Sequence, residues 1–139
     1  MKRLVAAVAA VILTTAHAGA QSYPGDSGAG VQRGIQQLNN SGQVGTVTLF
    51  NAGASTRLVV ELKGGPAHAQ SVKLFRGPSC DDVSTGAPAY VLGDAHNGRS
   101  ASAANAPESQ LLSGNYNVVV FASNRTGARA TACGHLYAS

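Results

Sequence analysis

The feature that most limits the fold of this chain is a series of short segments in which apolar and polar residues alternate. The segments GTVTLF (45–50), TRLVVELK (56–63) and SVKLF (71–75) alternate in this way, and YNVVVFAS (116–123) is rich in β-branched and aromatic residues. A period of two is typical of a strand with one buried face, and β-branched and aromatic side chains favour strands. The side chains predicted to face the core are Val47, Leu49, Leu58, Val60, Leu62, Val72 and Leu74.

Weaker segments extend the same pattern along the chain. Candidate strands lie at 31–38, 89–92, 99–104 and 130–137, although the glutamines of the first also suit a short helix, and residues 107–115 can hold one helical turn. Turns rich in Gly, Asn and Pro separate these segments. This spacing, without long helical segments between the strands, predicts an all-β fold: an antiparallel sandwich or flattened barrel of seven or eight short strands.

The N-terminal segment has the pattern of a secretory signal peptide. A basic start, MKR, precedes an apolar run at 4–13, and small residues suitable for cleavage end at Ala18 or Ala20. The apolar run is too short to cross a bilayer, which takes about 20 residues. We therefore expect residues 1–20 to be removed, and the product to be periplasmic or secreted without membrane insertion.

The rest of the chain is predicted to form one domain after a short leader. Residues 21–30, QSYPGDSGAG, have almost no apolar side chain and are expected to be a flexible leader, followed by the domain at 31–139. The string GDSGAG resembles the nucleophile segment of trypsin-like proteases, with Ser27 as the nucleophile. It precedes every predicted strand in a chain of only 139 residues, so we do not expect a protease.

The charge pattern argues against a nucleic-acid partner. The net charge of +4 falls to +2 without Lys2 and Arg3, and only 12% of the residues are charged. A nucleic-acid interface needs a stripe or patch of cations. The remaining basic residues show no run or cluster; they are Arg33, Arg57, Lys63, Lys73, Arg76, Arg99, Arg125 and Arg129.

The chain has two cysteines, Cys80 and Cys133. An exported protein reaches an oxidising compartment, where a disulfide is the usual state of such a pair, and two cysteines allow only one intramolecular pairing. By closing the loop between them, the bridge would stabilise the folded state by about 4 kcal/mol in the chain-entropy treatment. Two free buried thiols are the alternative.

The histidines of the expected mature chain do not form a ligand motif. Metal sites usually bring several imidazoles or carboxylates together at short, regular spacings. The closest such pair is Asp94 and His96, in the turn GDAHNG, whereas His68 lies in a loop and His135 follows the last cysteine. These four residues are weak metal candidates, and we expect the three histidines to be isolated at the surface.

Several segments, taken in order, resemble a known family. GTVTLF, SVKLFRGPSC, NGRS, LLSGNYNVVVFAS and ACG follow one another as in the secreted β-sandwich proteins related to copper–zinc superoxide dismutase and to the chordin-type (CHRD) domain. The resemblance covers about residues 31–137. It implies an antiparallel Greek-key β-sandwich and a disulfide between Cys80 and Cys133, whose sequence contexts match those of the family's paired cysteines.

The same resemblance implies that the copper site is lost. Its His-x-His pair falls at Lys73 and Phe75, and a later histidine ligand falls at Phe121. Phenylalanine has no lone pair to offer, and a protonated lysine repels a cation. We expect Lys73 to be a solvated side chain with its stem along the surface. If the strands of Phe75 and Phe121 are neighbours, the two rings are expected to pack together.

These observations predict a non-catalytic exported β-sandwich that serves as a binding or structural module. Its partner would be a protein or a surface ligand, with Lys73, Phe75 and Phe121 as a candidate contact surface, and no cofactor is expected. The alternative is a divergent dismutase-like metalloprotein that holds copper or zinc through residues outside the family's ligand positions. The weak metal candidates named above would then be its ligands.

Overall fold

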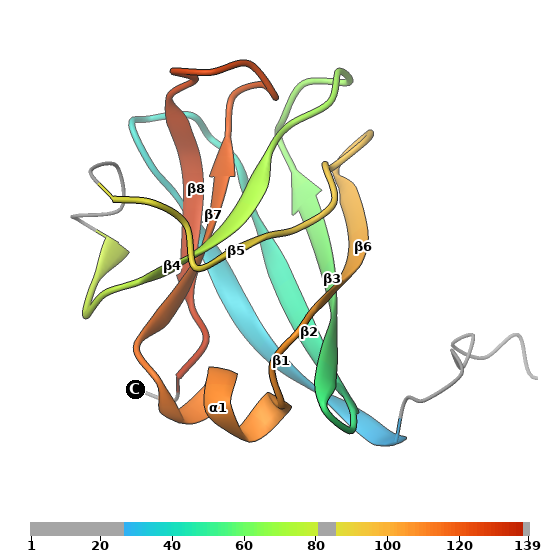
Figure 1. Cartoon of the computed structure of the whole chain (residues 1–139). Coiled ribbons are helices and arrows are strands. Elements are labelled where there is room, and N and C mark those ends of the chain that lie inside the picture. The colour runs from blue at the N-terminus through green and yellow to red at the C-terminus, as the bar shows by residue number, and fades with distance from the viewer. Residues whose placement is uncertain (1–26, 81–85, 138–139) are drawn as a thin grey trace, which may run out of the picture.

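The computed structural model describes residues 27–80 and 86–137, which form an antiparallel eight-stranded sheet that curls into a nearly closed barrel (Figure 1). The all-β fold predicted from the alternating segments is confirmed. The elements are β1 (Ser27–Gln37), β2 (Val44–Ala52), β3 (Ser55–Lys63), β4 (Val72–Arg76), β5 (Tyr90–Val91), β6 (Arg99–Ala104), α1 (Glu108–Ser113), β7 (Tyr116–Phe121) and β8 (Ala130–His135).

The strand order shows that the sheet is not a simple meander. The order is β5-β4-β7-β8-β1-β2-β3-β6, so β1 joins the half that contains β2, β3 and β6 to the half that contains β8, β7, β4 and β5. The chain crosses from one half to the other between β3 and β4 and returns between β5 and β6. Pairing of β3 with β6 and of β4 with β7 therefore gives Greek-key connections.

The barrel interior is filled by the side chains that alternation predicts to face inward. Successive residues of a strand point to opposite faces of the sheet. The pairing register of a strand therefore determines which of its side chains face the barrel interior. In the antiparallel pairing of β2 with β3, Val47 lies opposite Val60 and Leu49 opposite Leu58. All the residues predicted to face the core join its main cluster, and only Leu62 is partly exposed; the fully buried ones are Val47, Leu49, Leu58, Val60, Val72 and Leu74.

The start of the first strand differs from the prediction. The segment that suited either a strand or a short helix is a strand, and it begins at Ser27, within the expected leader at 21–30. The β1–β2 pairing matches Ser27 with Asn51 across an irregularity, so backbone hydrogen bonding extends the strand into a segment with almost no apolar residues. The signal peptide predicted at 1–20 lies outside the described residues.

The helical turn expected at 107–115 is confirmed as α1, which covers one end of the barrel (Figure 1). Its Leu111 is fully buried in the main core. Within the part of the chain that the structure describes, no helix is both long and apolar enough to cross a membrane.

The junction of the two halves depends on a glycine. A Cβ atom at Gly134 of β8 would lie 2.3 Å from the carbonyl oxygen of Gly34 in β1. That distance is far inside van der Waals contact, so only glycine lets the two backbones approach this closely. The ACG segment thus holds the disulfide cysteine and, next to it, the residue that brings β8 against β1.

A buried pair of glutamines joins connections at the end of the barrel opposite α1 (Figure 1). The side chains of Gln43 and Gln70 are both buried and exchange two hydrogen bonds of 2.8 and 3.0 Å. Gln70 also donates to the carbonyl oxygen of Phe121, and the Thr131 hydroxyl donates to Gln43. Buried amides need such partners because an unpaired one loses its hydration without compensation.

Candidate functional site

The outer face of β4, β7 and β8 carries the residues of the candidate contact surface. Because Val72 and Leu74 point into the core, Lys73 and Phe75 point outward from β4. The pairing register places Lys73 beside Val119, and Phe75 beside Asn117, on β7. The sequence thus positions both side chains on one face, as the alternation predicts.

Phe121, at the end of β7, completes this group. Its ring centroid lies 6.1 Å from that of Phe75, with the two rings tilted by 57°, which is within the range of favourable aromatic pairs. The ammonium nitrogen of Lys73 lies 5.2 Å from the centre of the Phe121 ring. The expected contact between the two phenylalanines is therefore present, and Lys73 lies partly exposed over one of them.

The predicted disulfide between Cys80 and Cys133 is confirmed, with the two Cα atoms 6.0 Å apart. Cys133 is buried, and it forms a second apolar cluster with Phe75 and Val119, separate from the barrel interior. The bridge ties the segment after β4 to β8 and so holds that segment over the outer face. It thereby encloses one side of the contact surface.

Two side chains hold the residues that precede Cys80, and a third side chain, His135, contacts both of them. The amide nitrogen of Asn117, which is fully buried, donates to the carbonyl oxygen of Gly77 at 2.8 Å, and the Tyr137 hydroxyl donates to that of Pro78 at 2.6 Å. Since the Asn117 nitrogen is used in this way, its oxygen accepts from Nδ1 of His135. The His135 ring also packs on Tyr137. His135 therefore has a structural role.

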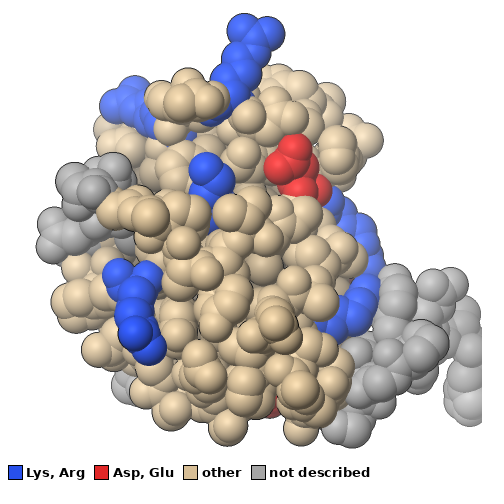
Figure 2. Space-filling view, viewed as in Figure 1, with Lys and Arg blue, Asp and Glu red and all other residues tan. Residues whose placement is uncertain are grey.

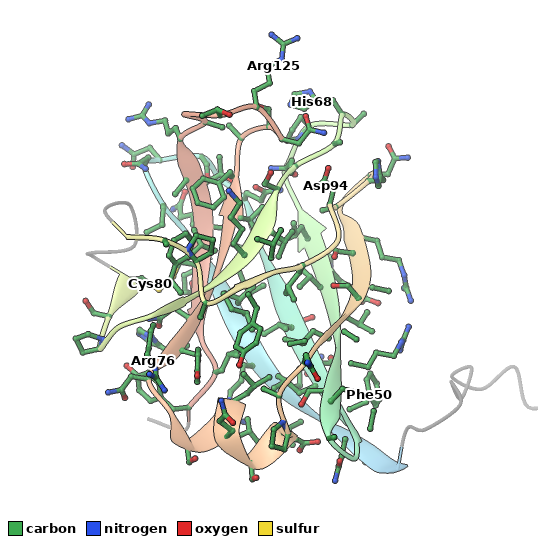
Figure 3. The ribbon with its side chains drawn as sticks, viewed as in Figure 1. Phe50, His68, Arg76, Cys80, Asp94 and Arg125 are labelled. Carbon is green, nitrogen blue, oxygen red and sulfur yellow. A yellow bond between two sulfur atoms is a disulfide. The ribbon has the colours of Figure 1, made fainter. Side chains whose placement is uncertain are left out.

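The other weak metal candidates do not line the larger hollow of this face and are not gathered with one another. Nε2 of His68 donates to the carbonyl oxygen of Ala122 at 2.8 Å, and a carboxylate oxygen of Asp94 accepts from Asn124 at 3.1 Å. Figure 3 shows His68 and Asp94 at the barrel end opposite α1. His96 is exposed. Among the described residues, no group of three or more His, Cys, Asp or Glu side chains is placed to hold a metal ion.

A cavity of about 650 Å³ opens on the outer face beside the disulfide. The turn after β1, the segments on both sides of the undescribed residues 81–85, and the connection between β7 and β8 surround it. Both apolar and cationic side chains line it. Those that matter for the argument are Leu38, Lys73, Phe75, Pro88, Phe121 and Arg129.

A smaller hollow of about 170 Å³ adjoins this cavity and shares Lys73 and Phe121 with it. Its remaining walls are mainly polar and include Ser71, Ser123 and Arg125. No acidic side chain of residues 27–80 or 86–137 lines either hollow. Asp81 and Asp82 lie outside the described residues.

The cations of this face are spread out rather than joined in a stripe. Figure 2 shows Lys and Arg side chains as separate groups divided by uncharged surface. Sequence reasoning treated Arg125 and Arg129 only as members of this scattered set. Arg129 could have been placed from the expected hairpin of the last two strands. Pairing of Phe121 with Ala130 in that hairpin brings Arg129 to the edge of the phenylalanine group.

The side chains at this face offer positive charge and apolar contact. The three positions that the resemblance equates with copper ligands, Lys73, Phe75 and Phe121, supply an ammonium group and two aromatic rings. Such groups attract anions and apolar surfaces, and they do not coordinate a metal ion. Comparison of the chain with protein-family models, with curated proteins and with solved structures finds no match.

Proposed function

We propose that this protein is a non-catalytic exported β-sandwich that acts as a binding module, with its ligand held on the outer face of β4 and β7. The observation that carries the proposal is the cavity of about 650 Å³ above Lys73, Phe75 and Phe121. Ligand sites in proteins are typically hollows of about 300–1,000 Å³ with apolar walls and a few polar groups. This cavity has that size, and polar and apolar groups share its walls, with Phe75 and Phe121 on its floor.

Export is part of the proposal. The basic start and apolar run of residues 1–20 have the pattern of a signal peptide, and the disulfide is of the kind that persists in oxidising compartments. The bridge also holds the segment that bounds the cavity. A surface built in this way suits a protein that works in the periplasm or outside the cell.

We propose that this surface arose by descent from the dismutase-related and CHRD-type sandwiches. The copper ligands would have been lost along the way. It is supported by the register that gathers Lys73, Phe75 and Phe121 on one outer face, beside the disulfide. A copper site would need lone pairs there. The Lys73 ammonium lies over a ring instead, so the former metal position would now serve recognition.

Metal loading separates this proposal from the metalloprotein alternative. The mature protein is incubated with copper and with zinc, desalted, and assayed for bound metal and for superoxide consumption. We expect neither stoichiometric metal nor activity. One metal ion per chain that is lost in His96→Ala or in His68→Ala would overturn the proposal and support the metalloprotein. The Arg76→Gln variant serves as a control for nonspecific loss.

The position of the binding surface can be tested independently of the ligand's identity. A set of small fragments that includes cations, neutral compounds and anions is screened by amide NMR of the isotope-labelled protein. We expect the shifts to map to β4, to β7 and to residues 127–130. Shifts confined to a different groove of the barrel, lined by Val44, Leu62 and Lys63, would overturn the assignment of this face.

A further inference from the structure

Lys73 lies where the two hollows of the outer face meet, because it lines both of them. Within residues 27–80 and 86–137, its ammonium group forms neither a salt bridge nor a hydrogen bond and contacts the Phe121 ring. A second cation, Arg129, lines the larger cavity, and a third, Arg125, lines the smaller hollow. Lys73 and Arg129 line the larger cavity together, and none of its described lining residues is acidic, so an anionic group is favoured there. In the smaller hollow, the lining residue Asn124 donates to the Asp94 carboxylate, and Arg125 extends away from the barrel (Figure 3).

The larger cavity offers an apolar surface next to these charges. Phe75 is only 7% exposed and belongs to the disulfide cluster, so its ring is held in place before any ligand arrives. Phe121 packs on Phe75, while Leu38 and Pro88 supply aliphatic walls. A surface that is already ordered loses little conformational entropy on binding. The side of the larger cavity formed by Phe75 and Phe121 therefore suits an apolar or aromatic group.

The size of the cavity distinguishes a small ligand from a polymer. About 650 Å³ is within the range of sites for small molecules. A polyanion such as a nucleic acid would need cations in a continuous track, and Figure 2 shows separate ones. The two hollows thus match the two ends of one compact molecule, with an apolar body in the larger and a charged group at their junction.

We infer that the ligand is a small amphiphilic organic anion, an aryl or short acyl compound with one carboxylate, phosphate or sulfonate group. The anionic group lies at Lys73, with Arg129 as the second cation, and the apolar body lies against Phe121 and Phe75. This inference rests on the proposed function, since it names the ligand class of the same surface. It goes further than the proposed function in one respect, because it requires the ligand to carry a negative charge.

Two matched dyes test the requirement for charge. The aromatic sulfonate 8-anilinonaphthalene-1-sulfonate has both an apolar body and an anionic group, and N-phenyl-1-naphthylamine has the same body without the sulfonate. We expect the sulfonate to bind with one molecule per chain and at least about tenfold more tightly than the neutral dye, as expected for a hydrogen bond to a charged group. Inorganic sulfate should compete weakly, because it lacks the apolar body.

Three variants test the residues. Lys73→Gln should weaken binding of the sulfonate by about tenfold or more, and Arg129→Gln by several-fold. Arg76→Gln removes one charge from the same strand, but Arg76 lies outside both hollows. The affinity of this variant for the sulfonate should therefore stay within about twofold of that of the unmodified protein. Circular dichroism and the free energy of unfolding of each variant show that the fold is kept.

The outcomes separate the inference from the proposed function. Equal affinity for the two dyes, an unchanged affinity in Lys73→Gln, or no binding of the sulfonate at millimolar concentration would each overturn the anionic ligand. If neutral fragments still shift the amides of β4 and β7, the proposed binding surface stands without the anion. If no fragment of any charge shifts those amides, both fail.

Discussion

The ammonium nitrogen of Lys73 lies 5.2 Å from the centre of the Phe121 ring, at the junction of two hollows on the outer face of the sheet. A cation over an aromatic face contributes about 0.5–1 kcal/mol at an exposed site. The contact orders the charge without neutralising it. The Lys73 charge therefore stays partly exposed above the Phe121 ring.

The ring pair of Phe75 and Phe121 should be measurable as a coupling energy. In a double-mutant cycle with Phe75→Leu and Phe121→Leu, we expect a coupling of about 0.5–1.5 kcal/mol in the free energy of unfolding, because the rings are in direct contact. The measurement is denaturant unfolding with the disulfide intact. A cycle of Phe121→Leu with Phe50→Leu is the control, because Phe50 lies on β2 in the other half. Coupling as large in the control as in the pair would contradict this interpretation.

Removal of the disulfide should be the most costly change of the outer face. Cys80 and Cys133 are separated by 53 positions, and closing a loop of that length stabilises the fold by about 4 kcal/mol in the chain-entropy treatment. We therefore expect Cys80→Ala/Cys133→Ala to lose about 3–4 kcal/mol of unfolding free energy, measured by urea titration. A loss below about 1 kcal/mol would show that the unfolded chain gains little freedom without the bridge.

The buried glutamine pair should behave as a unit. Gln70→Met keeps the approximate shape but leaves the amide of Gln43 with fewer partners, so we expect a loss of about 1–3 kcal/mol. The double variant Gln43→Met/Gln70→Met should cost less than the sum of the two single changes, because no amide then remains buried without its partner. Gln36→Met, at an exposed position of β1, is the control. Strictly additive losses in thermal or urea unfolding would refute the coupling.

Gly134→Ala should destabilise the junction of β8 with β1. Its Cβ atom would lie 2.3 Å from the Gly34 carbonyl oxygen, so one of the two backbones must shift. We expect a loss of about 1–3 kcal/mol, the usual cost of forcing an extra methyl group into a packed region. Gly77→Ala is the matched control, because a Cβ atom there meets no atom within 4 Å. Equal melting temperatures of the two variants would argue against the close approach.

The core and the strands were predictable because both depend on a local pattern. Alternation identified Val47, Leu58 and Val72 as inward-facing, and the structure buries all three. The same alternation placed Lys73 and Phe75 outward together. Each of these inferences needs only the period of a strand and the fact that one face of the sheet is covered.

The start of β1 and the buried amides were not predictable in this way. Residues 27–30 contain almost nothing apolar, and Gln43 and Gln70 lie in connections that resemble solvated turns. Backbone pairing with β2 extends the first strand, and burial of the glutamines depends on their meeting each other across 27 positions. A polar side chain is recognised as internal only when its partner is known.

By itself, the sequence determined an all-β antiparallel domain, its inward faces, a single possible disulfide and the absence of imidazoles at positions 73, 75 and 121. Only the tertiary structure decided that Lys73 and Arg129 line one cavity, with Phe121 as a shared wall. Alternation is a property of neighbouring residues, and it is therefore visible in the chain. The cavity arises from segments far apart in the sequence, which strand pairing and the disulfide bring to the same face.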